Sequence, residues 1–183
     1  CYNPPVFELL FDMMWGEGVK DLEKWQRNYV VKRYGCDHPA LWEAWFFLFA
    51  SRYRYYSLID DSLLCHSPAL TDGNEPDMNI VHAWKQMLDA ADELKNCSAY
   101  LFDLANIGRE AMSSFAPQLL HEIVEALESK DLEAFTMHAA DLLQYIRDCD
   151  ALMGTSEHFL LGRWIDAARS WGTTNDEKQR LEW

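Results

Sequence analysis

Residues 131–153 read DLEAFTMHAADLLQYIRDCDALM, and this stretch decides the fold class. Its apolar side chains recur every three or four positions, at Leu132, Phe135, Ala139, Leu142, Leu143 and Ile146. That spacing places them along one face of an α-helix. Asp131 stands just before the first of them, where its carboxylate can cap the free N–H groups of the first turn. We therefore predict an amphipathic helix over residues 131–153.

Helical spacing continues on both sides of this stretch. Proline, aspartate or serine opens most of the segments and glycine closes several, as expected for helix ends. The segments predicted to be helical are 3–15, 21–34, 39–56, 79–94, 98–128, 131–153, 156–171 and a last one from Thr174. No segment shows the alternation of apolar and polar residues that is typical of a β-strand. The sequence therefore predicts an all-α fold, a bundle of about seven to eight helices.

Two of these segments have unusual features. Segment 39–56 carries apolar side chains on nearly all sides, which is typical of a buried helix. Segment 98–128 contains Pro117, which lacks an N–H and clashes with the carbonyl four residues earlier, at Ser113. We expect segment 39–56 to be among the most buried helices, and a kink or a break at Pro117.

The composition indicates a folded, acidic protein. Hydrophobic residues make up 49% of the chain, with 8 Trp, 8 Tyr and 9 Phe. That is too much apolar surface for a disordered chain. The net charge of −14 comes entirely from residues 55–183, because residues 1–54 carry equal numbers of acidic and basic side chains. Such a surface repels phosphates and anionic lipids, and no apolar run reaches the roughly 18 residues of a membrane span. We expect no nucleic-acid partner and no membrane.

Residues that could carry chemistry are scattered. The five cysteines and six histidines are Cys1, Cys36, Cys65, Cys97, Cys149, His38, His66, His82, His121, His138 and His158. The cysteine spacing argues against a disulfide framework or a zinc site, although a single disulfide is compatible with it. The motifs of di-iron centres, zinc hydrolases, serine hydrolases and phosphate loops do not occur. Asp72, Asn74, Glu75 and Asp77 offer oxygen ligands for calcium but lack the EF-hand spacing. We expect no metal, no cofactor and no catalytic residue.

Several longer motifs follow one another along the chain. They are Asn3-Pro4-Pro5-Val6-Phe7, Arg33-Tyr34-Gly35, Ala83-Trp84, Tyr100-Leu101-Phe102-Asp103-Leu104 and Phe159-Leu160-Leu161-Gly162-Arg163-Trp164. They cover nearly the whole chain, and the last is the most specific. The series resembles the C-terminal part of the α-N-acetylglucosaminidases, a family of glycoside hydrolases.

This resemblance implies a larger enzyme that hydrolyses terminal α-linked N-acetylglucosamine from glycans. Its catalytic domain would be a (β/α)₈ barrel whose two glutamates retain the anomeric configuration. Residues 1–15 would be the last helix of that barrel, and residues 16–183 a helical C-terminal domain that is truncated at its C-terminal end. Both glutamates would precede Cys1, so we expect the chain to be inactive alone and to self-associate through orphaned apolar surface. By the same resemblance, bacterial members are secreted or periplasmic and eukaryotic members are lysosomal.

One substrate-binding residue also follows from the resemblance. The family's helical domain lends the sugar pocket a histidine from a loop shortly before a Ser-Pro pair. In this sequence Cys65-His66-Ser67-Pro68 lies in the corresponding loop. His66 is therefore the candidate residue at the rim of the pocket.

Two other functions are compatible with the residues alone. A free-standing acidic helical module could bind a basic partner through its charged face. An unrelated small enzyme could use His121 or His138 as a general base, but neither histidine has a partner residue in a recognisable motif.

Overall fold

The computed structural model describes residues 4–16, 18–51 and 76–181. Every regular element within these ranges is a helix. The elements are α1 (Pro4–Trp15), α2 (Leu22–Tyr34), α3 (Pro39–Ala50), α4 (Met78–Asp89), α5 (Ala91–Leu94), α6 (Ser98–Glu128), α7 (Leu132–Gly154), the 3₁₀ turn η3 (Glu157–Phe159), α8 (Leu161–Ser170) and α9 (Asn175–Arg180). The prediction of an all-α fold is confirmed for the described part of the chain.

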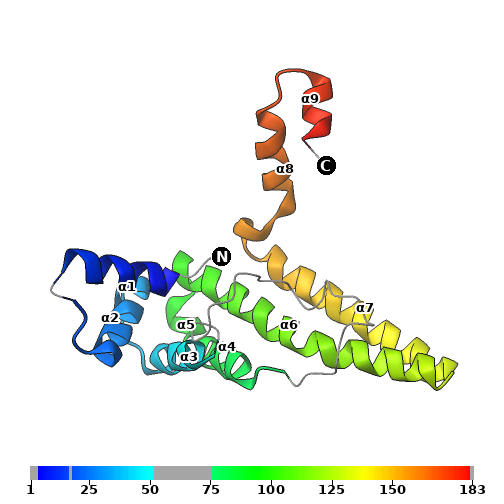
Figure 1. Cartoon of the computed structure of the whole chain (residues 1–183), viewed down its shortest axis with the longest axis horizontal. Helices are drawn as coiled ribbons and strands as arrows, with labels where there is room; N and C mark the ends of the chain where they lie inside the picture. Colours follow the sequence, from blue (N-terminus) through cyan, green and yellow to red (C-terminus); the bar gives the residue numbers. More distant parts are fainter. Residues whose placement is uncertain (1–3, 17, 52–75, 182–183) are drawn as a thin grey trace.

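The helices are arranged around the long helix α6. Figure 1 shows α6 and α7 running antiparallel side by side, with α2, α3, α4 and α5 gathered beside the first half of α6. Helices α8 and α9 form a hairpin that projects away from the end of α7. The core therefore lies between α6 and the group of helices from α2 to α5.

The helix ends lie where the capping residues of the sequence place them. The carboxylate of Asp21 accepts a hydrogen bond from the backbone N–H of Lys24, and that of Asp131 accepts one from Ala134, both at 3.0 Å. Gly35 closes α2 in the left-handed region, at φ 71°, where a residue without a Cβ is favoured. Thr174 and Glu177 cap the start of α9 reciprocally. Local sequence thus determines these boundaries.

Three predicted boundaries or features differ from the structure. Segment 79–94 is divided at Ala90 into α4 and α5, and segment 156–171 is divided at Leu160 into η3 and α8. Of the kink or break predicted at Pro117, the break does not occur, since α6 runs continuously from Ser98 to Glu128. Helix α6 packs against α4 and α7, and the hydroxyl of Tyr145 on α7 donates a hydrogen bond to the Met112 carbonyl at 2.6 Å. These contacts stabilise the continuous helix by more than the loss of the one hydrogen bond that the proline removes.

The centre of the core is aromatic. Its largest fully buried side chains include Trp45, Tyr29 and Tyr100, and the ring of Tyr29 meets Trp45 edge to face at 5.0 Å. Helix α3 supplies Trp45 and three other buried residues, but Phe46 on its opposite side is 66% exposed. The prediction that this segment is among the most buried helices is therefore confirmed for residues 39–50, although one side of α3 is exposed, and residues 52–56 lie outside the described ranges.

Helix α6 approaches α4 and α7 closely at one glycine. A Cβ built on Gly108 would lie 2.8 Å from the indole of Trp84 and 2.9 Å from a methyl group of Leu152. The position has an ordinary helical backbone, so the constraint is the space between the three helices.

This close approach predicts the effect of adding one methyl group. Gly108→Ala should lower the free energy of unfolding by about 1–2 kcal/mol, because overpacking against a rigid indole exceeds the gain in helix propensity. Gly154→Ala, where no atom lies within 4 Å of the new Cβ, is the matched control and should be neutral or slightly stabilising. Urea denaturation of both variants measures the difference, and equal stabilities would contradict it.

Candidate functional site

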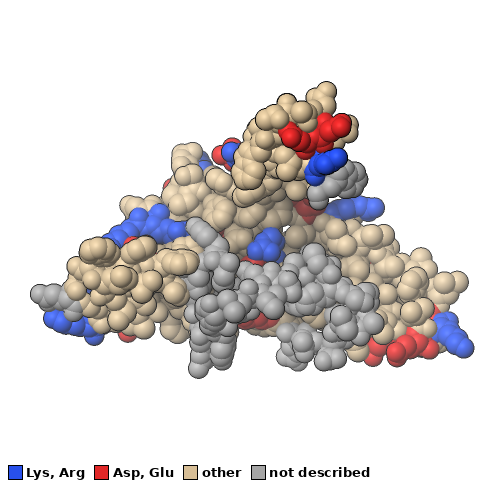
Figure 2. All heavy atoms as spheres, turned by 45° about the horizontal axis from the view of Figure 1, so that its top comes forward, with Lys and Arg blue, Asp and Glu red and all other residues tan. Residues whose placement is uncertain are grey.

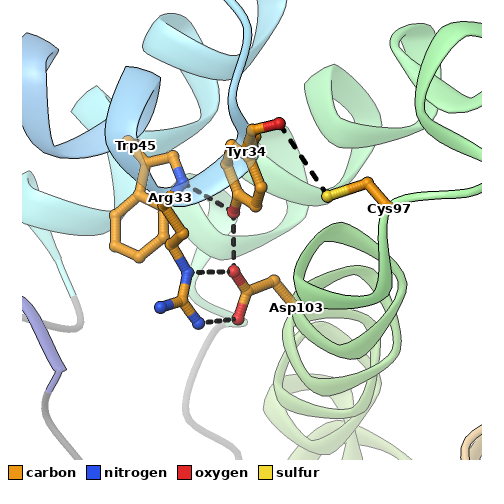
Figure 3. Close-up of polar contacts among 5 residues, drawn as sticks. All are labelled: Arg33, Tyr34, Trp45, Cys97 and Asp103. Carbon is orange, nitrogen blue, oxygen red and sulfur yellow. Dashed lines mark hydrogen bonds and ion pairs between the residues drawn. The ribbon is translucent and has the colours of Figure 1, made fainter.

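A buried polar cluster joins α2, α3 and α6 (Figure 3). The Arg33 guanidinium on α2 faces the Asp103 carboxylate on α6, donating from Nε to Oδ2 and from Nη2 to Oδ1, the latter at 2.7 Å. The hydroxyl of Tyr34 donates to Oδ2 of Asp103 at 2.7 Å and accepts from the indole N–H of Trp45 at 2.9 Å. Four side chains from three helices thus form one connected network.

The charges in this cluster stabilise each other. Burial disfavours the charged guanidinium, but the hydrogen bonds and charge of Asp103 outweigh that effect and raise the pKa of Arg33 above its ordinary value. Burial, together with the negative charge of Asp103, raises the pKa of Tyr34 well above its ordinary value. The Arg33 guanidinium also lies 5.8 Å from the ring centroid of Trp45, which adds a cation–π contact.

The cluster is an anchor and not a catalytic group. Asp103 is only 6% exposed, and both of its carboxylate oxygens accept hydrogen bonds from Arg33 and Tyr34. A general acid or base must reach the proton that it transfers, and a nucleophile must reach the substrate. Asp103 meets neither condition, so the network serves to hold α2, α3 and α6 together.

The other motif residues also make contacts inside the fold. The hydroxyl of Tyr100 on α6 donates to the Met87 carbonyl at 2.6 Å, at the end of α4. Phe159, in the Phe-Leu-Leu-Gly-Arg-Trp motif, stacks on Phe102 of α6 with ring centroids 5.2 Å apart. Trp84 also lies beside Gly108 of α6. Each motif from residue 33 onward therefore either belongs to α6 or contacts it.

The two histidines considered as catalytic bases are half-buried, and each lies beside a glutamate. His121 contacts Glu125 at 3.3 Å, and His138 contacts Glu122 at the same distance. Across residues 4–16, 18–51 and 76–181, no hydrogen bond joins either imidazole to a Ser, Thr or Cys nucleophile. Nor does this part of the chain bring three or more His, Cys, Asp or Glu residues together as metal ligands. The structure therefore gives no support to a small independent enzyme.

Pockets open between the helices of the described residues, and two of them are lined by several aromatic side chains. One, of about 300 Å³, lies between α2 and α3, where the Arg27 guanidinium sits 3.2 Å from the ring centroid of Trp42. The other, of about 570 Å³, lies between α4, α6 and α7 and is lined mainly by apolar side chains, including Trp84, Phe115 and Tyr145. Neither of them brings together a base, a nucleophile and a group that could stabilise a developing charge.

A large apolar surface is exposed on α1. The outward side chains of this helix are Val6, Phe7, Leu10, Phe11, Met13, Met14 and Trp15, with Trp15 83% exposed. Helix α1 contacts α2 through two polar links, from the Trp25 indole N–H to Asp12 at 2.7 Å and from Lys32 to Glu8 at 4.0 Å. Contiguous apolar patches of this kind on soluble proteins mark sites of interaction.

Charged side chains do not form a single dominant patch on the face drawn in Figure 2. Acidic and basic side chains occur there in small separate groups with uncharged surface between them. Among the described residues, no helix is both long enough and apolar enough to cross a membrane.

With this geometry in place, the chain can be compared with known families. Residues 25–183 match the family described as "Alpha-N-acetylglucosaminidase (NAGLU) C-terminal domain". The chain belongs to this family. The match begins within α2, includes α3 to α9 and leaves α1 outside it.

Individual relatives agree with the family assignment. Human α-N-acetylglucosaminidase is 28% identical over 190 residues, covering 98% of this chain and 25% of the human protein. Two structures from Clostridium perfringens share the fold: an enzyme variant with its substrate GlcNAc-α-1,4-galactose (TM-score 0.84), and a family 89 glycoside hydrolase with PUGNAc (TM-score 0.82). Each is 24% identical, and each comparison covers 98% of this chain and 22% of the neighbour. The chain spans about a quarter of the length of these relatives.

The predicted site residue of this α-N-acetylglucosaminidase domain is not among those that the structure describes. His66 lies outside the described residues, as do Asp72, Asn74 and Glu75 of the acidic loop. Asp77 is described, and its carboxylate caps α4 by accepting from the Asn79 N–H at 3.0 Å. The pairing of Arg33 with Asp103 was missed, although both residues stand in motifs that carry the family resemblance.

Removal of one partner of the buried pair should be costly. Asp103→Ala should lower the free energy of unfolding by about 3–5 kcal/mol, because the Arg33 charge would stay buried without its partner. Glu8→Ala, which removes the exposed partner of Lys32, is the control and should change it by less than about 1 kcal/mol. Replacing both charges, in Arg33→Met with Asp103→Leu, should recover part of the loss. Denaturant unfolding that found Asp103→Ala no more harmful than Glu8→Ala would contradict the role of the pair.

Proposed function

We propose that this chain is the helical C-terminal part of a retaining α-N-acetylglucosaminidase that removes terminal α-linked N-acetylglucosamine from glycans. The supporting observation is the exposed apolar face of α1 on a domain that belongs to the α-N-acetylglucosaminidase family. The domain supports the catalytic barrel and lends a residue to the rim of the sugar pocket.

The chemistry of the reaction requires groups outside this chain. A retaining glycosidase needs two carboxyl groups about 5–5.5 Å apart, one as nucleophile and one as acid and base. In a (β/α)₈ barrel both would come from the C-terminal ends of strands. Asp103, the buried carboxylate of the described residues, is occupied by Arg33 and Tyr34. We therefore assign both catalytic groups to the barrel of the complete enzyme.

Residues 1–15, which include α1, are proposed to be the last helix of that barrel, and residues 16–183 the helical domain. The family match begins at residue 25, beyond α1. The apolar side of α1 is exposed, whereas Asp12 and Glu8 reach α2. A barrel helix would present its apolar side to the strands and its polar side to the next domain. The exposed apolar side of α1 and its polar contacts with α2 agree with this expectation.

His66 is proposed to contact the terminal sugar from the helical side of the pocket. An imidazole can donate or accept a hydrogen bond with a sugar hydroxyl. This role rests on the family resemblance of the segment Cys65-His66-Ser67-Pro68. The glycan is accordingly the substrate of the complete enzyme and not a ligand of this chain alone.

The isolated chain should therefore be inactive. We expect no detectable hydrolysis of an aryl α-N-acetylglucosaminide and no measurable affinity for free N-acetylglucosamine. The complete enzyme assayed in parallel is the positive control. Turnover by the chain alone, abolished by mutating one Asp or Glu within it, would show that the domain assignment is wrong.

The exposed face of α1 should make the isolated chain self-associate. Sedimentation velocity should show dimers or larger species at micromolar concentration, because bare apolar patches of this size drive association. Met14→Lys, at a residue that is 64% exposed on that face, should weaken the association by about tenfold or more. Gln179→Lys on α9 makes the same change of charge elsewhere and should leave it unchanged. A monomer at all concentrations would contradict the expectation.

Replacing His66 in the complete enzyme should impair substrate binding. His66→Ala should lower kcat/KM by about 10- to 100-fold, since the loss of a hydrogen bond to substrate is worth roughly 1–3 kcal/mol. His121→Ala, at a half-buried position on α6, is the matched control and should leave kcat/KM unchanged. Identical kinetics for the two variants would remove His66 from the pocket.

A further inference from the structure

The segment that follows α2 and the segment that precedes α6 lie side by side. The Cys97 thiol contacts the backbone carbonyl oxygen of Tyr34, with Sγ and O 3.9 Å apart (Figure 3). On the other side, Nε2 of His38 lies 3.6 Å from Oε1 of Glu93. Cys36 stands midway between Tyr34 and His38 in the sequence. It is therefore held between two contacts to the stretch that contains Cys97.

The two thiols are buried to a similar degree. Cys36 and Cys97 are both half-buried, and both pack against the main hydrophobic core. Burial is the largest cause that raises the pKa of the Cys36 thiol. The neighbouring Cys97, Glu93 and Asp37 raise this pKa further, in that order. The contacts of Tyr34 with Cys97 and of His38 with Glu93, on either side of Cys36 in the sequence, place the two cysteines on facing segments.

Both cysteines stand at positions where the backbone is fixed. Gly35 ends α2 with its N–H bonded to the Val31 carbonyl at 2.8 Å, and Cys36 follows directly. Cys97 is the N-cap of α6, and its own N–H donates to the Leu94 carbonyl at 2.8 Å. Ordered turns reduce the entropy that must be lost when two thiols are joined.

We propose that Cys36 and Cys97 form a disulfide site that reacts with a small disulfide such as oxidised glutathione. The thiolate of one cysteine attacks a glutathione sulfur, which forms a mixed disulfide and releases one reduced glutathione. The second thiolate then attacks the protein sulfur of that mixed disulfide and releases another. The two protein thiols lose two electrons and two protons in total, and one oxidised glutathione becomes two reduced ones.

The cross-link would join the same two helices as the buried ion pair. Arg33 and Asp103 connect α2 to α6 through a charge-assisted contact. A bond between Cys36 and Cys97 would connect the C-terminal end of α2 to the N-terminal end of α6. It would also close the chain between residues 36 and 97, which restricts the unfolded state more than a short loop would. The expected consequence is a more stable domain under oxidising conditions, with the same fold.

The test is to map disulfides after oxidation of the full 183-residue chain by oxidised glutathione at about pH 8.5, where the reactive thiolate fraction is larger than at neutral pH. Non-reducing proteolysis and mass spectrometry should find the Cys36 and Cys97 peptides linked, at least about tenfold above any other pair. Cys149, buried in α7, is the internal control and should stay reduced. The same oxidation in denaturant should yield mixed pairings. Native chain in which Cys36 and Cys97 stay unlinked, while the denatured chain oxidises freely, would overturn the proposal.

A second measurement separates the cross-link from incidental oxidation. Oxidised wild-type chain should melt about 5–15 °C higher than the same chain in dithiothreitol. Cys149→Ser should keep that difference, and Cys36→Ser should lose it. A difference that survives in Cys36→Ser would assign the effect to another pair and contradict the proposal.

Discussion

The ion pair between Arg33 and Asp103 is the interaction on which the rest of the fold depends. It is nearly enclosed, and Tyr34 and Trp45 complete its hydrogen bonding, so that α2, α3 and α6 meet at one point. A charge buried without a partner is far more costly than an exposed one. Because each partner stabilises the charge of the other, moving α2 away from α6 would leave a charge buried without its partner. The aromatic core around Tyr29, Trp45 and Tyr100 then packs against a fixed frame.

The motifs that carry the family resemblance form this frame and not a catalytic site. Arg33 and Asp103 pair with each other, Trp84 packs on Gly108, and Phe159 stacks on Phe102. All of these contacts converge on α6. For the supporting role that we propose, the contacts that matter most are those that fix helices to one another. One surface that remains open, on α1, is apolar and suited to a further protein surface.

Features that depend on neighbouring residues could be predicted from the sequence. The helices, the caps at Asp21, Asp131 and Thr174, and the stop at Gly35 follow from local hydrogen bonding. Features that depend on contacts between distant segments could not. Pro117 leaves α6 unbroken because α4 and α7 hold it, and the partner of Arg33 lies 70 residues away. His66 stays a prediction, because it lies outside the described residues.

Hydrogen exchange of α1 tests most directly whether this chain is a supporting domain that the rest of an enzyme completes. Exchange is measured by mass spectrometry in the isolated chain and in the complete enzyme, with the amides of α6 around Asp103 as the reference. If the apolar side of α1 packs on a barrel, its amides should exchange at least about tenfold more slowly in the complete enzyme. The reference amides should exchange equally in both. Equal exchange of α1 in the two proteins would contradict the account.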